Sequence, residues 1–229
     1  MADRLSAARS QLRRADPALA AIIDERPDFD PRAWLSKLLP PMDAFGALLF
    51  QVVGQELSVS SARAIVARIQ DTYGGHLPDP PELLRTQPDQ LRATGLSRRK
   101  VETLRELARR FAAGEFSDTS LARLPDDAIE AALTEIPGIG PWTARGFLII
   151  FLDRPDVLPI GDLALRRAVQ RIYGLDQPPS EKEFQQIADR WRPHRTLAVM
   201  YLFESEYQQG NVHRGQQGVS PLSAAAIHH

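Results

Sequence analysis

Apolar residues recur along this chain at intervals of three and four, the spacing that brings them to one face of an α-helix. Glycine or proline separates most segments with this spacing, and no segment shows the convincing apolar-polar alternation of a half-buried strand. We therefore expect an all-α protein. The predicted helices are Pro17–Glu25, Met42–Gln55, Ser60–Tyr73, Pro81–Arg85, Arg99–Ala113, Ala128–Ile136, Trp142–Leu152, Leu163–Tyr173, Glu181–Arg192 and Thr196–Tyr207.

The helical spacing is lost after Tyr207, and residues 208–229 are predicted to form a flexible tail. Upstream of it the chain has no clear linker, internal repeat or low-complexity tract. A length of 229 residues is enough for one large or two small domains with a hydrophobic core. Pattern and length alone therefore leave the number of domains open.

Composition excludes several classes of protein. The chain has no cysteine, which excludes disulfides, a zinc ribbon and an iron–sulfur cluster held by cysteines. Its five histidines are scattered without a His-x-x-x-His pair, so no transition-metal site is predicted. No apolar run reaches the length of a membrane span, and the first residues lack a signal-peptide core. We expect a soluble protein of the cytoplasm.

The most specific motif is the segment Leu133–Ala144, which reads LTEIPGIGPWTA. A predicted helix ends at Pro137, Gly138 and Gly140 bracket a tight turn, and a second helix begins directly after it. The glycines leave amide N–H groups bare at the start of the second helix, which makes that helix end an anion site. A lone Pro-Gly turn is equally well explained by an ordinary loop. The full pattern favours a hairpin that holds a DNA phosphate.

Asp162 stands twenty positions after Trp142, directly before the helix predicted to begin at Leu163. Spacing alone favours a structural role, because aspartate before a helix is a common N-cap. The alternative role is catalytic, because a carboxylate held beside a carbon that develops positive charge stabilises that charge and orients an attacking water. One side chain can both cap and catalyse.

The overall charge is unusual for a protein that binds nucleic acid. The formal net charge is −1 and the sequence pI is about 6.5, whereas a basic face is the usual footprint of such proteins. Any positive surface must therefore be local, and phosphate binding must rely on backbone amides.

Two segments together, Pro137–Ala144 and Pro159–Arg167, resemble the helix–hairpin–helix DNA glycosylase superfamily, and most closely its alkylation-repair branch, 3-methyladenine DNA glycosylase II. The resemblance covers roughly residues 15–207. It continues through three further motifs in the family's order: Val53–Ser60, Gly95–Lys100 and Asp189–Arg195.

The resemblance implies a two-lobed helical fold with a base-binding cleft between the lobes. We expect residues 1–55 and 160–207 to form the terminal lobe and residues 56–159 the central lobe, with the hairpin at about 133–150. The strand-rich N-terminal domain of longer members is expected to be absent.

The resemblance also assigns roles to single residues. Asp162 matches the catalytic aspartate, and Trp142 stands where strand-nicking members have a lysine, so a monofunctional enzyme is expected that uses water and leaves an abasic site. It places Trp142, Phe203 and Gly146 in the base pocket, and it assigns contacts with the DNA backbone to Gly138, Gly140, Thr143, Arg98 and Lys100. It also implies that Glu56 or Leu57 is the wedge that enters the gap left by the base, and that the carbonyl groups of Thr134, Ile136 and Ile139 can hold a structural Na⁺ or K⁺.

We therefore expect a monomeric glycosylase that flips alkylated purines, such as 3-methyladenine, out of damaged double-stranded DNA and needs no catalytic cofactor. Because relatives have larger aromatics in place of Gly146 and Phe203, a roomier pocket that accepts several lesions is also expected. Two alternatives remain. One is a helix–hairpin–helix module that binds DNA without catalysis. The other is a glycosylase for oxidised or mismatched bases, which Trp142 and the absence of cysteine disfavour.

Overall fold

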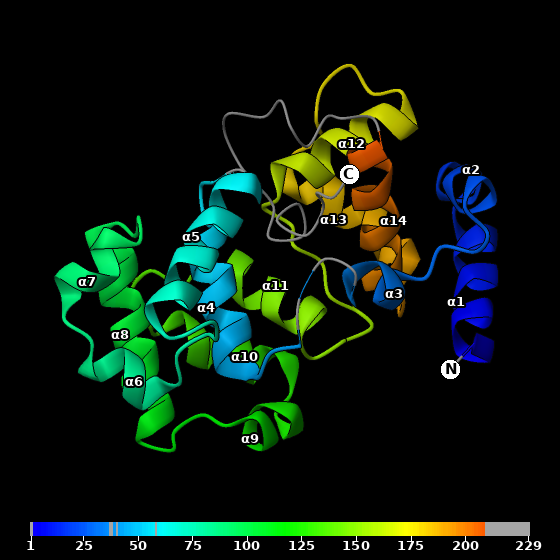
Figure 1. Cartoon of the computed structure of the whole chain (residues 1–229). Helices are drawn as coiled ribbons and strands as arrows, with labels where there is room; N and C mark the ends of the chain where they lie inside the picture. The colour runs from blue at the N-terminus through cyan, green and yellow to red at the C-terminus, as the bar shows by residue number, and fades with distance from the viewer. Residues whose placement is uncertain (1, 37–38, 40, 58, 209–229) are drawn as a thin grey trace.

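The structure is a computed structural model that describes residues 2–36, 39, 41–57 and 59–208. Within these residues every regular element is a helix, which confirms the all-α expectation (Figure 1). The elements are α1 (Ala2–Ala15), α2 (Pro17–Glu25), α3 (Pro31–Ser36), α4 (Ala44–Gly54), α5 (Val59–Thr72), α6 (Pro80–Arg85), α7 (Pro88–Ala93), α8 (Arg98–Ala112), α9 (Asp118–Arg123), α10 (Asp126–Thr134), α11 (Pro141–Ile150), α12 (Leu163–Tyr173), α13 (Glu181–Ala188), the 3₁₀ turn η1 (Asp189–Trp191) and α14 (Arg195–Gln208).

The helices pack in two groups that stand side by side in Figure 1. The terminal group contains α1 to α3, α12, α13, η1 and α14, with α14 at its centre. The central group contains α4 to α8, α10 and α11. Each group therefore combines helices that are distant in sequence, and the chain crosses between the groups twice.

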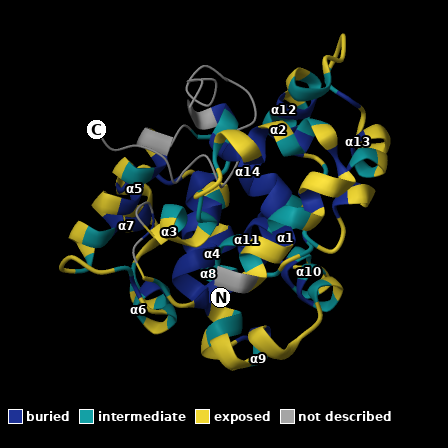
Figure 2. Ribbon diagram, turned by 90° about the vertical axis from the view of Figure 1, so that its right-hand side faces the viewer, coloured by how far each residue is buried: buried dark blue, intermediate teal, exposed yellow. Residues whose placement is uncertain are grey.

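The position of α4 differs from the predicted lobe boundary at residue 55. Every residue of α4 is buried, and the helix packs against α5, α8 and α11 (Figure 2). An element that is apolar on all sides needs neighbours on all sides, and the central group supplies them. The boundary therefore falls between α3 and α4. The predicted tail at 208–229 lies outside the described residues except for Gln208.

Aromatic packing ties the short helix α3 to the terminal group. The ring centroids of Phe29 and Trp34 are 5.9 Å apart, and those of Phe29 and Tyr201 on α14 are 5.1 Å apart.

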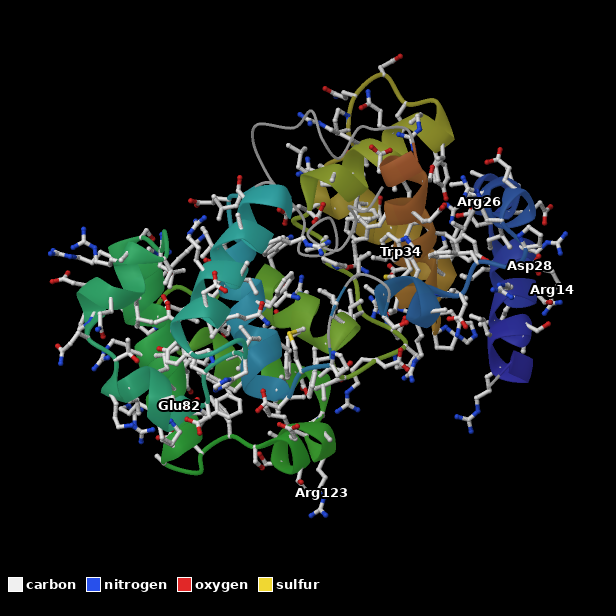
Figure 3. The ribbon with its side chains drawn as sticks, viewed as in Figure 1. Arg14, Arg26, Asp28, Trp34, Glu82 and Arg123 are labelled. Carbon is white, nitrogen blue, oxygen red and sulfur yellow. The ribbon has the colours of Figure 1, made fainter. Side chains whose placement is uncertain are left out.

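The side chains of Arg14 on α1 and Arg123 on α9 extend outward into solvent (Figure 3). No helix among the described residues is both long and apolar enough to cross a membrane.

A buried carboxylate holds the terminal group together. Asp16 is fully buried at the N-cap of α2 and accepts hydrogen bonds from the backbone N–H groups of Ala18 and Leu19. It also accepts a hydrogen bond from Trp191 Nε1 at 2.7 Å and one from the hydroxyl of Tyr173. One side chain therefore links α2, α12 and η1.

Asp16→Ala should lower the free energy of unfolding by about 3 kcal/mol or more, because it removes a helix cap and leaves buried N–H and O–H donors without an acceptor. The matched control is Asp79→Ala, which removes an exposed N-cap on α6 and should cost about 1 kcal/mol. Urea unfolding of both variants measures the difference. Equal losses for the two variants would contradict the central role of Asp16.

Candidate active site

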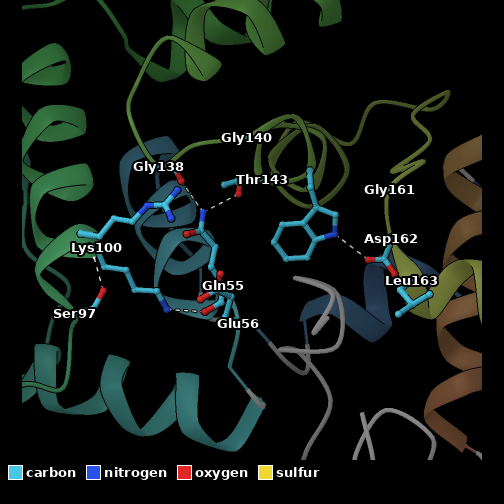
Figure 4. A pocket seen from close by; sticks show the side chains of 12 residues that line it. Gln55, Glu56, Ser97, Lys100, Gly138, Gly140, Thr143, Gly161, Asp162 and Leu163 are labelled. Atoms are coloured by element: carbon cyan, nitrogen blue, oxygen red, sulfur yellow. Dashed lines mark hydrogen bonds between the residues drawn. The ribbon is translucent and has the colours of Figure 1, made fainter. Parts of the chain in front are cut away.

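A cavity of about 400 Å³ lies where the central group meets the start of α12 (Figure 4). It is open to solvent, and its walls come from four places in the sequence: the turn after α4, the start of α8, the hairpin between α10 and α11, and the segment that enters α12. The residues that line it are Gln55, Glu56, Ser97, Arg99, Lys100, Gly138, Gly140, Trp142, Thr143, Gly161, Asp162 and Leu163.

Asp162 is the N-cap of α12, as the spacing indicated. Its Oδ1 accepts a hydrogen bond of 3.0 Å from the backbone N–H of Leu165. Its Oδ2 accepts a second bond, of 2.9 Å, from the indole Nε1 of Trp142 (Figure 4). The carboxylate lines the cavity although the residue is only 3% exposed. Two N–H donors from different helices thus fix the orientation of a negative charge at the cavity wall.

Trp142 is half-buried in the first turn of α11 and reaches the cavity rather than the core. Its indole N–H points at Asp162, so the ring is held by the same hydrogen bond that orients the carboxylate. The resemblance assigned this residue to the base pocket. Its contact with a base, as the resemblance implies, remains a prediction.

The hairpin turn requires glycine at position 138. The φ angle of Gly138 is +96°, and a Cβ atom there would lie 2.1 Å from Oγ1 of Thr103 on α8. That hydroxyl donates a 2.7 Å hydrogen bond to the carbonyl oxygen of Pro137, so it cannot move aside without losing the bond. The close approach of α8 to the turn therefore depends on the missing side chain.

Gly140 has a different role. Its φ is −100°, which any residue can adopt, and apart from its chain neighbours no described residue has an atom within 4 Å of the position that a Cβ would take. It is the N-cap of α11 but supplies no side-chain acceptor to the helix. The first amides of a ten-residue helix thus open onto the cavity without a side-chain cap, as the sequence predicted for an anion site.

Gln55 joins the turn after α4 to the hairpin. Its Nε2 donates to the carbonyl oxygen of Gly138 at 3.0 Å and to Oγ1 of Thr143 at 2.9 Å. The sequence analysis quoted this residue in the motif at Val53–Ser60 but gave it no role. Its signal was a polar side chain directly after a buried helix, where a backbone or hydroxyl partner is expected. Thr143, predicted to contact DNA, is buried and belongs to this network.

Lys100 requires a correction, because its ammonium group is engaged inside the protein. Nζ donates to the carbonyl oxygens of Val53 at 2.8 Å and Gln55 at 2.6 Å, at the end of α4. Burial lowers the pKa of Lys100, while the nearby Glu56 carboxylate opposes the shift. A cation at a helix C-terminus interacts favourably with the free carbonyls there. The residue therefore closes α4 and supports the turn instead of offering a free cation to DNA.

Arg99, rather than Arg98, is the arginine of this helix start that lines the cavity. Both side chains are exposed in the first turn of α8. The basic run Arg98–Lys100 signalled a local positive patch, but the sequence could not tell which of three consecutive side chains faces the hairpin, because successive helix residues point about 100° apart.

The predicted aromatic pocket does not match the lining of this cavity and remains a prediction. Phe203, in α14, is 2% exposed and is not among the residues that line the cavity. Gly146 is buried in α11 and likewise lies outside the lining. The expectation of a roomier pocket rested on these two positions and likewise remains a prediction. Trp142 is the one predicted pocket residue on the cavity wall.

The carbonyl site predicted for Na⁺ or K⁺ remains a prediction. Thr134 ends α10, and Ile136 and Ile139 lie in the hairpin turn, where the N–H of Ile139 donates to the carbonyl of Ile136 at 2.9 Å. A carbonyl oxygen has a second lone pair, so this bond is compatible with a cation. Among the described residues, no cluster of histidine and carboxylate side chains could hold a metal ion.

The sequence and the fold both match known proteins. The pattern that defines the HhH-GPD superfamily of base excision DNA repair proteins matches residues 50–193. DNA-3-methyladenine glycosylase 1 of Schizosaccharomyces pombe is 30% identical over 165 residues, which are 71% of this chain and 72% of that protein. DNA-3-methyladenine glycosylase 2 of Escherichia coli is 30% identical over 176 residues. That match takes 72% of this chain but only 58% of the relative's length.

Two solved structures have the same architecture. The S. pombe 3-methyladenine DNA glycosylase in complex with abasic DNA superposes with a TM-score of 0.69 at 26% identity, covering 83% of this chain and 97% of that one. The DNA-3-methyladenine glycosidase of Bacillus halodurans superposes with a TM-score of 0.67 at 28% identity, covering 90% of this chain and 94% of that one.

Proposed function

The chain belongs to the HhH-GPD superfamily of base excision DNA repair proteins, and from this premise we propose that it is a monofunctional DNA glycosylase for alkylated purines. In the proposed reaction it extrudes the damaged nucleotide from duplex DNA and hydrolyses the bond between sugar and base.

The proposal rests on the position of Asp162. It places a carboxylate at the wall of a cavity next to the uncapped start of α11, and the two hydrogen bonds from Trp142 and Leu165 prevent it from rotating away. A charge fixed before the reaction stabilises a developing opposite charge without the cost of reorganisation. The arrangement suits a reaction that builds positive charge on a sugar.

The bond changes follow from this charge. The bond between C1′ and the purine nitrogen breaks, and its electron pair leaves with the base. Asp162 stabilises the cation-like sugar and accepts a hydrogen bond from the water that adds to C1′. The proton released from that water passes to the carboxylate and then to solvent. The products are the free base and an abasic site.

The substrate class follows from the leaving group and from the relatives. An alkylated purine that carries positive charge departs as a neutral base, so its release needs little help from an acid, and the described residues that line the cavity include no histidine. The relatives in S. pombe and E. coli are both named DNA-3-methyladenine glycosylases. We place 3-methyladenine among the substrates for these two reasons.

Binding of the DNA backbone is assigned to the start of α11 and to Arg99. The N–H groups of Gly140, Trp142 and Thr143 suit one phosphate, and the exposed guanidinium of Arg99 lines the same cavity and can reach a neighbouring phosphate. Backbone contacts of this kind hold any sequence, which suits an enzyme that must search undamaged DNA.

Asp162→Asn should lower the single-turnover rate of base excision by about a hundredfold or more, because the amide keeps the shape and the cap but loses the charge. Binding to DNA that carries an abasic-site analogue should persist. Asp79→Asn, the same exchange at the N-cap of α6 away from the cavity, is the matched control. Excision by Asp162→Asn near the wild-type rate would refute the assignment and favour a module that only binds DNA.

Gly140→Ala should weaken binding to damaged and undamaged duplexes by a similar factor of about ten, because the methyl group projects into the open space before the amides of α11. Its stability should match wild type. Gly138→Ala is the contrasting variant, since its clash with Thr103 should destabilise the hairpin itself. Loss of affinity for damaged DNA alone would count against the phosphate role. Fluorescence anisotropy and thermal unfolding provide the two readouts.

Borohydride treatment during turnover should trap no covalent complex with DNA, because no lysine stands at position 142 and the Nζ atom of Lys100 is engaged by two carbonyl oxygens. Denaturing gel electrophoresis detects such an adduct. A trapped complex that disappears in Lys100→Met would overturn the monofunctional assignment and identify the amine.

A further inference from the structure

Glu56 occupies the tip of the turn that follows α4. Its φ angle is +58°, a left-handed conformation that is uncommon outside glycine. Its side chain is exposed where the turn lines the cavity. Leu57, the next residue, instead packs against the hydrophobic core. The unusual backbone conformation therefore presents the carboxylate, and not its apolar neighbour, to whatever enters the cavity.

The surroundings of Glu56 leave its carboxylate free to bind a ligand. No hydrogen bond or ion pair of this carboxylate is found within the part of the chain that the structure describes. The ammonium group of Lys100 attracts it electrostatically, but Nζ itself donates hydrogen bonds to the carbonyl oxygens of Val53 and Gln55; Figure 4 shows the position of Lys100 beside this turn. This buried cation offsets the repulsion that a carboxylate would feel beside DNA phosphates.

The proposed reaction fixes where DNA lies relative to Glu56. A nucleotide in the cavity has its C1′ atom at Asp162 and a flanking phosphate at the start of α11. A space of about 400 Å³ holds one base and not the duplex, so the rest of the DNA stays at the mouth. The gap left in the base stack then faces the cavity, and the unpaired base of the other strand borders that gap. Glu56 lies across the cavity from Asp162 and is exposed there (Figure 4).

A carboxylate discriminates between the bases that can stand opposite the lesion. It only accepts hydrogen bonds, and cytosine offers it the two hydrogens of its N4 amino group. Thymine presents the O4 acceptor at the equivalent position, which repels the carboxylate. An uncharged leucine at the same place would not distinguish the two bases by hydrogen bonding.

We propose that Glu56 reads the base opposite the excised one and favours cytosine over thymine. This inference rests on the proposed glycosylase function and deepens it. Cytosine pairs with guanine and thymine with adenine. The contact should therefore favour excision of an alkylated guanine paired with cytosine over an alkylated adenine paired with thymine, beyond any difference in affinity for the two damaged bases. Glu56 is then a specificity-determining residue on the strand that the reaction leaves intact.

The test compares binding to two duplexes that carry an abasic-site analogue in the same sequence, one with cytosine and one with thymine opposite. Wild type should bind the cytosine duplex about tenfold more tightly, the discrimination expected of one good hydrogen-bonding contact to a base edge. In Glu56→Leu and Glu56→Gln the ratio should fall to about one, because the cytosine duplex loses its charged hydrogen-bond acceptor and the thymine duplex loses a repulsive contact. Glu102→Gln, an exposed glutamate on α8 outside the cavity lining, is the control and should keep the ratio of wild type.

The preference for cytosine is supported only if it is present in wild type and lost in both Glu56 variants. A wild-type ratio near one, or a preference that survives in Glu56→Leu, overturns it. Base excision from methylated DNA is measured on the same preparations. Failure of wild type to excise any base would instead refute the proposed function, so the two ideas fail by different results.

Discussion

The carboxylate of Asp162 is the point at which the two helix groups meet chemically. One of its oxygens accepts from Leu165 of α12, in the terminal group, and the other from Trp142 of α11, in the central group. Each group thus supplies one of these two donors. Residues from both groups line the cavity, so a shift between the groups would change the direction of the carboxylate. The fold thus couples the packing of distant segments to the chemistry proposed for one side chain.

The sequence predicted the helices better than the walls of the site. Helical spacing located α8 and α12 to within one residue, because the apolar face of a helix is visible in the order of its residues, and the nearly continuous apolar run of α4 was located to within two residues. It missed α1, which is dominated by polar and charged residues and buries mainly Ala8 and Leu12. It also missed the short helices α3, α7 and α9, although it located α6, which has the same length of six residues, to within one residue.

The candidate site was predictable where backbone chemistry defined it. Gly138, Gly140 and Asp162 carry turn and cap signals that are local in sequence, and all three line the cavity. Side chains that depend on tertiary packing were not predictable in this way. Lys100 differs from expectation because the partner that engages it, the end of α4, is distant in sequence. Resemblance supplied a position for it, but the local packing decides what the side chain does there.

The uncapped start of α11 has a consequence for the ionic conditions under which the protein works. Proteins that hold DNA with many lysines and arginines gain much of their affinity by displacing cations condensed on the phosphates, and they lose it steeply as salt concentration rises. This chain has a net charge of −1 and presents amide dipoles at its hairpin. An amide that binds a phosphate displaces few of the cations condensed on the DNA, so the affinity of the protein for DNA should depend only weakly on ionic strength. A repair enzyme built in this way gives up long-range attraction and keeps a contact that persists when the salt concentration of its surroundings changes.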